Sequence, residues 1–170
     1  MIRLVNKITL LFLFLISLGG ISYGQNSNDV KLANHYYQKG EFDKAEVYYK
    51  KLVSKSNSST FFDRYFMCLY YQEKFEEAEK VVSKRIKKDP YSSDLKFKLA
   101  SVYEITDRMP EADKIYLKMI DDLQAIQSRV DNLGKKFKLL GKYDYALQTY
   151  LKGKKLMKKG YGFQLELAEL

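Results

Sequence analysis

Apolar residues recur along this chain with the spacing of amphipathic helices, and the helices themselves recur at a fixed period. An alanine returns at Ala45, Ala78, Ala112 and Ala146, in steps of 33, 34 and 34 residues. Bulky apolar side chains stand nine and three residues before each alanine and four residues after it. These columns are Tyr36, Leu69, Tyr103 and Phe137; Phe42, Phe75, Met109 and Tyr143; and Tyr49, Val82, Tyr116 and Tyr150. A period of this size predicts a repeat architecture built from helices.

Turn residues divide each repeat into two helices. In the first repeat, Asn28 or Asp29 is expected to cap a helix that runs to about Lys39, because their side chains accept hydrogen bonds from first-turn N–H groups. Gly40 then allows the positive φ at which a helix commonly ends. A second helix is predicted from Phe42 to about Lys55.

The later repeats carry similar signals. Thr60 with Asp63 three residues on resembles an acidic variant of the capping box. The cluster at residues 92–94 is expected to cap the next helix, and Pro110 suits the first turn of the helix after that, where its missing N–H costs nothing. Helix pairs are therefore expected throughout.

Small residues recur where the two helices of a repeat are expected to cross. Helix axes come within about 8–10 Å of each other only where small side chains meet. The facing small residues are Ala33 and Ala45, Ala100 and Ala112, and Gly134 and Ala146. The aromatic columns are expected to fill the space around these crossings.

At these columns the chain resembles the tetratricopeptide repeat (TPR) family, whose unit is 34 residues folded as two antiparallel helices. The resemblance implies an all-α fold, a right-handed α-solenoid of antiparallel helix pairs. Four repeats are placed near residues 26–58, 59–92, 93–126 and 127–160. Residues 161–170 are interpreted either as the start of a fifth repeat in a longer protein or as a capping helix.

The N-terminus has the layout of a secretory signal peptide over residues 1–24. Arg3 and Lys7 precede a run of 14 uncharged, largely apolar residues, and small residues at Ser22 and Gly24 precede Gln25. The alternative is an uncleaved anchor, although a spanning helix needs about 20 apolar residues. The chain is therefore predicted to be exported, to the periplasm or the outside of the cell.

No combination of residues in the sequence indicates catalysis. A single His35 and a single Cys68 cannot supply a Cys–His or Ser–His–Asp arrangement or a zinc site. Cys68 is expected to be buried and inert. The paired carboxylates at residues 76–77 and 121–122 are expected on solvent-facing helix positions. We therefore predict no enzyme activity, no cofactor and no bound metal.

Members of the TPR family bind other proteins in a concave groove lined by the first helix of each repeat. The resemblance carries this role to nine residues here: Asn34, Tyr37, Arg64, Tyr70, Tyr71, Lys98, Ser101, Asn132 and Lys135. Aromatic and cationic side chains are typical anchors of interfaces. The alternative is that these residues only pack repeats together or lie idle on the surface. Of the family's carboxylate-binding pattern, only Asn34 matches in kind.

The chain is basic, with a formal net charge of +9. Nine lysines and one acid lie between Lys135 and Lys159. This region is interpreted mainly as solvated helix surface. The alternative is that it binds an acidic protein or an anionic membrane surface. Nucleic acid is a less suitable partner, because the chain is predicted to be exported.

The sequence therefore predicts a non-catalytic protein–protein interaction scaffold of the cell envelope that binds a peptide or protein segment in a concave groove. The alternative is the N-terminal TPR module of a longer envelope sensory or assembly protein whose activity lies beyond Leu170.

Overall fold

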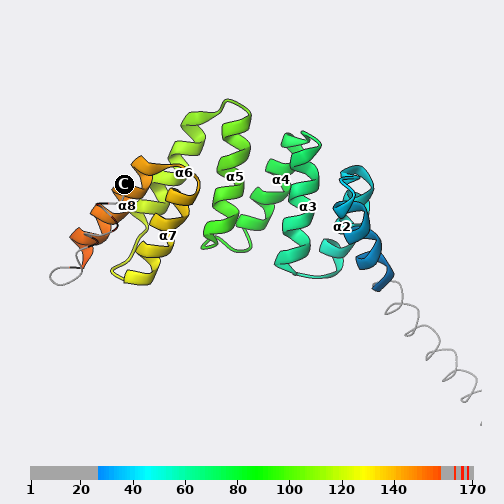
Figure 1. Cartoon of the computed structure of the whole chain (residues 1–170), viewed down its shortest axis with the longest axis horizontal. Coiled ribbons are helices and arrows are strands. Elements are labelled where there is room, and N and C mark those ends of the chain that lie inside the picture. Colours follow the sequence, from blue (N-terminus) through cyan, green and yellow to red (C-terminus); the bar gives the residue numbers. More distant parts are fainter. Residues whose placement is uncertain (1–26, 158–162, 164–165, 167, 169–170) are drawn as a thin grey trace, which may run out of the picture. The chain divides into compact units, whose positions relative to one another are not determined.

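The structure, a computed structural model, describes residues 27–157 together with 163, 166 and 168 (Figure 1). The predicted signal peptide and most of residues 161–170 lie outside the described residues. A helix over residues 27–38 comes first. The helices that follow are α2 (Phe42–Lys55), α3 (Ser59–Tyr71), α4 (Phe75–Ile86), α5 (Ser93–Ile105), α6 (Met109–Asp121), α7 (Gln127–Leu139) and α8 (Tyr143–Leu156).

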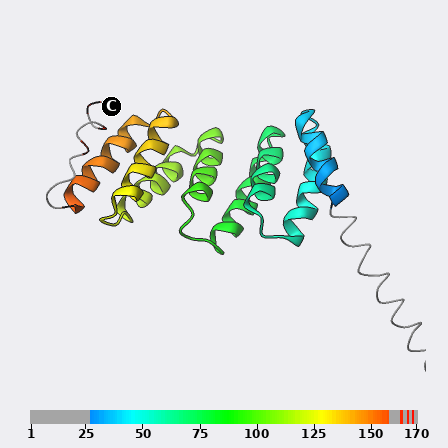
Figure 2. The same cartoon turned by 60° about the horizontal axis from the view of Figure 1, so that its bottom comes forward.

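The described residues are all helix, turn or connecting segment, with no strand among them. The chain divides into two compact units, one ending at Ala78 and the other beginning at Glu79. In the first unit α2 packs against α3. In the second, α5 lies beside α6, α7 lies beside α8, and α6 also contacts α8 (Figure 2). Successive helices thus pack against their neighbours as in an α-solenoid of helical repeats, and the predicted fold class is confirmed.

The turn inside each helix pair closes with the same backbone hydrogen bond. The N–H groups of Glu41, Lys74, Arg108 and Lys142 donate to carbonyls five residues earlier, at N···O distances of 2.9, 2.9, 2.8 and 2.9 Å. Gly40 and Gly141 take φ values of +73° and +71° at this turn, as glycine readily does. Glu73 (φ +58°) and Asp107 (φ +56°) adopt the same left-handed conformation in the two middle turns. The sequence indicates the turns at the two glycines and at residues 106–109, whereas Glu73 gives no turn signal of that strength.

Two of the predicted helix caps are wrong and one is confirmed. Ser92 caps α5, its Oγ accepting from the Leu95 N–H at 3.4 Å. Ser58, and not Thr60, caps α3 and accepts from the Phe61 N–H at 3.4 Å. The reason is that α3 already begins at Ser59, which places Thr60 inside its first turn. Asn28 and Asp29 likewise lie inside the first helix, which includes residue 27.

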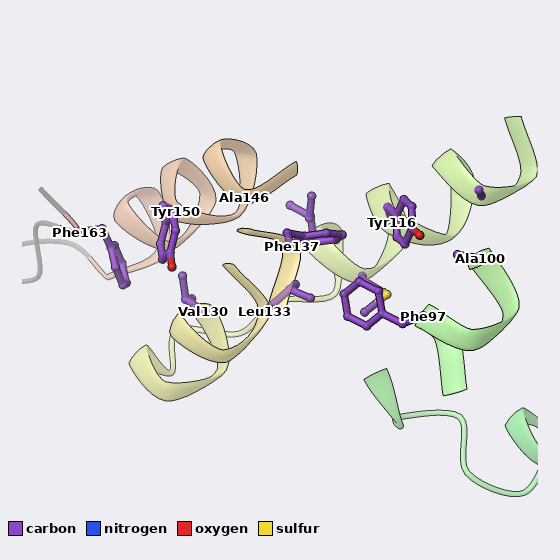
Figure 3. Close-up of a cluster of buried hydrophobic side chains, with 12 residues drawn as sticks. Phe97, Ala100, Tyr116, Val130, Leu133, Phe137, Ala146, Tyr150 and Phe163 are labelled. Atoms are coloured by element: carbon purple, nitrogen blue, oxygen red, sulfur yellow. The ribbon is translucent and has the colours of Figure 1, made fainter. Parts of the chain in front are cut away.

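The small residues at the helix crossings are fully enclosed. The alanines at positions 33, 45, 78, 100, 112 and 146 are all 0% exposed. In the second unit, aromatic side chains surround these crossings (Figure 3). The ring of Phe137 lies 5.1 Å from that of Phe97 and 5.4 Å from that of Tyr116, centroid to centroid. The predicted combination of small crossing residues and flanking aromatics therefore forms the core.

The acidic residue directly after the recurring alanine contacts the following repeat in each of the first three repeats. The Glu46 carboxylate accepts from Lys74 at 2.6 Å and from the Gln72 amide at 3.1 Å. The Glu79 carboxylate accepts from Arg108 at 2.7 Å and from the Tyr103 hydroxyl at 3.1 Å. The corresponding residues of the third and fourth repeats are Asp113, which accepts from Tyr145, and Leu147. These inter-repeat contacts are absent from the sequence-based picture, because each joins residues more than 20 positions apart.

We expect the Glu46–Lys74 pair to stabilise the first unit measurably. The Glu46 side chain is 11% exposed, and Glu46→Ala removes the acceptor shared by the Lys74 ammonium and the Gln72 amide, so the change should cost about 1–3 kcal/mol. A double-mutant cycle with Lys74→Ala, read by urea unfolding, should give a coupling energy of about 1 kcal/mol. The matched control is the Glu41–Lys44 pair, whose side chains are 34% and 56% exposed and whose coupling should stay below about 0.5 kcal/mol. Equal coupling energies for the two pairs would contradict the expectation.

Candidate functional site

Five of the predicted groove residues lie in the first unit and form one connected group. The Tyr49 hydroxyl donates to Asn34 Oδ1 at 2.7 Å. The ring of Tyr37 stands edge-on to that of Tyr49, with centroids 6.0 Å apart. The Arg64 guanidinium lies 4.4 Å above the Tyr37 ring, a cation–π distance. Arg64 on α3 and Tyr37 on the first helix thereby present a charged group and an aromatic face together.

The group continues through ring contacts to Tyr71. Phe42, at the start of α2, contacts Tyr37 at 5.5 Å and stacks on Tyr71 at 4.6 Å between ring centroids. The ring of Tyr70 lies against those of Tyr71 and Phe75, at 6.5 and 5.5 Å. Tyr71 remains 53% exposed. We name this group the Tyr37–Tyr71 surface; its members are Asn34, Tyr37, Phe42, Arg64, Tyr70 and Tyr71.

The Tyr37–Tyr71 surface has the composition of a protein-binding surface. Tyrosine and arginine supply large, amphipathic contact areas, and they are enriched among residues that dominate binding energies. The rings hold one another in place, so a ligand that contacts them pays little additional side-chain entropy. Phe42 is the member that sequence reasoning missed; its place in the column three residues before the alanine indicates only a core position.

The four predicted groove residues of the second unit are not brought together in the same way. Lys98 pairs with Asp94 and its side chain is only 14% exposed. The Ser101 hydroxyl donates to the Lys98 carbonyl at 2.8 Å. Lys135 is exposed on α7, and Asn132 lines a pocket. The structure thus engages Lys98 and Ser101 in contacts within α5.

The pocket at Asn132 has a volume of about 930 Å³ and lies between α5, the end of α6 and α7. We name it the α5–α7 pocket. Its lining residues are Tyr91, Ser93, Asp94, Lys96, Phe97, Met119, Asp122, Leu123, Gln124, Arg129, Asn132, Leu133 and Lys136. Asn132 is the one predicted site residue in its wall. The remaining lining comes from three segments whose proximity depends on helix packing, so the linear pattern gives no signal for it.

The lysine-rich region from Lys135 to Lys159 is partly neutralised within the second unit. Lys142 donates to Glu104, and Lys152 pairs with Asp121 at 3.5 Å. Lys136 lies 5.8 Å from the ring of Phe97. Some of its cations therefore serve contacts between helices, and the described part of the region is not a uniform basic patch.

One of the four carboxylates expected on solvent-facing positions, that of Glu77, accepts hydrogen bonds from two other helices. Glu77 is half-buried and accepts from Lys50 and from the Tyr65 hydroxyl, both at 3.0 Å. The hydrogen bond from Lys50 is the main cause that lowers the pKa of the Glu77 carboxyl. The expectation that Glu77 is merely solvated is therefore wrong: it links α2, α3 and α4 within the first unit. Glu76 beside it is exposed, as expected.

The Cys68 thiol is buried, as predicted, with 0% of its surface exposed. Burial is also the main cause that raises its pKa to about 12. His35 contacts the Tyr36 ring edge-on at 5.6 Å. Within the described residues, no group of three or more His, Cys, Asp or Glu side chains is arranged to hold a metal ion.

We expect Cys68 to react with a thiol reagent only when the first unit opens. The thiolate is the reactive form, and burial disfavours it. At pH 8, labelling by DTNB in buffer should be at least on the order of a hundredfold slower than in urea. The raised pKa also means that the thiol's contribution to stability is complete below pH 9 and is lost as the pH rises toward about 12. Equal labelling rates in buffer and in urea would contradict the buried thiol.

None of the helices among the described residues combines the length and apolar character needed to cross a membrane.

These features define a helical repeat protein whose exposed aromatic and cationic side chains gather on a surface. No family model matches the chain. Over 83 residues it is 35% identical to a TPR repeat-containing protein of Methanocaldococcus jannaschii, a match that covers 46% of this chain and 26% of that protein. The chain is thus similar to a TPR repeat-containing protein, and the match spans about a quarter of that relative's length.

Proposed function

We propose that this chain is a non-catalytic scaffold of the cell envelope that binds a protein or peptide segment on the Tyr37–Tyr71 surface. The observation that carries the proposal is the arrangement of Arg64 over Tyr37, beside Tyr71 stacked on Phe42. An extended segment would lay apolar or aromatic side chains on the tyrosine faces and an acceptor group near the guanidinium. The similarity to a TPR repeat-containing protein supports a role in protein–protein interaction.

Location in the envelope rests on the signal-peptide layout of residues 1–24. It predicts that the exported protein begins near Gln25. N-terminal sequencing of the protein from a periplasmic or secreted fraction tests this directly. A first residue of Met1 would contradict cleavage and favour an anchored chain.

A second candidate is supported by the greater length of the relative, of which the match covers 26%. In this alternative the repeats form the N-terminal module of a longer envelope sensory or assembly protein whose activity lies beyond Leu170. The Tyr37–Tyr71 surface would then recruit the partner on which the rest of that protein acts.

The test of the proposed surface is affinity capture from an envelope fraction followed by binding of the purified partner. The bait is compared with an Arg64→Ala/Tyr71→Ala variant and with a control, Val47→Ala/Lys51→Ala. Val47 and Lys51 are exposed on α2, and the control likewise removes one cation and one apolar group. We expect the Arg64/Tyr71 variant to bind at least roughly tenfold more weakly, because both residues are of the type that anchors interfaces. A partner that binds both variants equally would place the interaction elsewhere.

A further inference from the structure

The α5–α7 pocket combines a fixed apolar floor with a charged rim. Its floor contains Phe97, Met119 and Leu133, which are only 6, 5 and 7% exposed and belong to the aromatic core of the second unit. Figure 3 shows Phe97 and Leu133 in this core. Phe97 is held by ring contacts to Phe137 and Tyr116. Because core packing fixes these side chains, the floor is formed before any ligand arrives.

The charges of the rim do not balance among themselves. Three cations, Lys96, Arg129 and Lys136, and two carboxylates, Asp94 and Asp122, line the pocket. Each carboxylate already has a lysine partner outside the lining. Asp94 pairs with Lys98, and Asp122 pairs with Lys118 at 2.7 Å.

The three lining cations are paired with acids less fully than the two lining carboxylates are paired with lysines. Arg129 donates to the neutral Gln124 Oε1 at 2.6 Å, and Lys136 lies over the Phe97 ring. Lys96 is close enough to Asp122 to contribute to the lowered pKa of that carboxyl, although the Lys118 hydrogen bond contributes most. The rim therefore carries an excess of positive charge that an anionic ligand would complement.

The neutral polar groups of the pocket indicate which class of anionic ligand fits it. The Asn132 amide offers a donor and an acceptor, the Gln124 amide offers its N–H donors while its Oε1 accepts from Arg129, and Ser93 adds a hydroxyl. A peptide backbone matches this mixture, since it presents both N–H and C=O groups, whereas the phosphate of a lipid headgroup presents mainly acceptors. Tyr91 at the rim is 90% exposed and offers an aromatic face to a passing chain.

We infer that the α5–α7 pocket binds an acidic peptide segment, with carboxylates against Lys96, Arg129 and Lys136 and an apolar side chain on the floor formed by Phe97, Met119 and Leu133. The occupant is a segment of a partner protein in which Asp or Glu residues lie next to a leucine-like or aromatic residue. This site lies wholly in the second unit and shares no residue with the Tyr37–Tyr71 surface. It therefore goes beyond the proposed function and can be tested independently of it.

The experiment begins with selection of short random peptides displayed on phage against the purified chain. Enriched peptides are synthesised with both termini blocked, so that no terminal carboxylate contributes, and their binding is measured by fluorescence anisotropy. We expect enriched sequences to combine Asp or Glu with a neighbouring large apolar residue. Their binding should weaken as salt is raised, because screening reduces the attraction between exposed charges.

Two matched variants then locate the site. Lys96→Gln/Arg129→Gln/Lys136→Gln should weaken binding of these peptides at least roughly tenfold. The control, Lys114→Gln/Lys154→Gln/Lys155→Gln, removes the same net charge from exposed positions of the same unit and should bind as the unchanged chain does. The Arg64→Ala/Tyr71→Ala variant should also bind these peptides normally, which separates this site from the first-unit surface.

Three results would overturn the inference. One is that the triple pocket variant and the triple-lysine control weaken peptide binding equally, which would mean a non-specific effect of net charge. Another is enrichment of peptides without acidic residues. The third is binding to phosphatidylglycerol vesicles that is lost in the pocket variant while no selected peptide binds the pocket, which would assign these cations to a membrane surface.

Discussion

Replacing Phe137 by alanine is expected to lower the free energy of unfolding of the second unit by about 3–5 kcal/mol. The Phe137 side chain is 0% exposed. Its ring contacts those of Phe97, Tyr116 and Tyr145, with centroids 5.1, 5.4 and 5.4 Å apart. Truncation removes the buried ring and leaves a cavity that α5, α6 and α8 can fill only by moving. The effect is large because one side chain joins the two helix pairs of this unit (Figure 3).

Urea unfolding followed by circular dichroism measures this loss. The matched control is Leu139→Ala, two residues further along α7, where the side chain is 79% exposed and the change should stay within about 0.5 kcal/mol. Because the chain forms two compact units, the transition should be checked with more than one probe before a two-state free energy is assigned. A similar loss for both variants would contradict the central place of Phe137.

The second large effect is expected at Gly134, where alanine should destabilise the protein. In an exposed helix interior, alanine is favoured over glycine by about 1 kcal/mol. Here a Cβ atom would lie 2.4 Å from the Tyr150 ring, far inside van der Waals contact. Tyr150 is itself 0% exposed and packs against Phe163, so its ring has little room to retreat. Overpacking of this kind costs about 1–3 kcal/mol, so the net effect of Gly134→Ala should be a loss of stability.

A double variant distinguishes the clash from other effects. Tyr150→Leu will destabilise the protein alone, because it truncates a buried ring. If the clash is the cause, Gly134→Ala should cost less in the Tyr150→Leu background than in the unchanged chain, as measured by thermal unfolding. An increase in stability for the single Gly134→Ala variant would mean that the two helices separate at no cost.

Much of the fold can be predicted from the sequence because its causes are local or periodic. The α2 helix spans Phe42–Lys55, as the apolar spacing and Gly40 indicate. Pro110 lies in the first turn of α6, as expected of a residue without an N–H. Predicted helix starts are less accurate. Ser58 and Thr60 could both cap α3, and the path of the chain after the end of α2 decides which of them does.

The candidate site is less predictable, because it depends on side-chain directions between helices. Helical positions and the family resemblance indicate Asn34, Tyr37, Arg64, Tyr70 and Tyr71, and the structure connects these five. The same rule also indicates Lys98 and Ser101, which the structure engages within α5 through Asp94 and the Lys98 carbonyl. No spacing rule indicates that Asp94 captures Lys98, or that Glu77 links Lys50 to Tyr65.

By itself, the sequence determines the helical period, the small residues at each crossing and the glycines of two turns, since these follow from contacts within a few residues or from repetition. Only the tertiary structure decides the links from Glu46 to Lys74 and from Glu79 to Arg108, the contact through Phe42 that joins Tyr37 to Tyr71 and the α5–α7 pocket. Each of these joins side chains far apart in the sequence, and small differences in helix packing set which atoms come within contact distance.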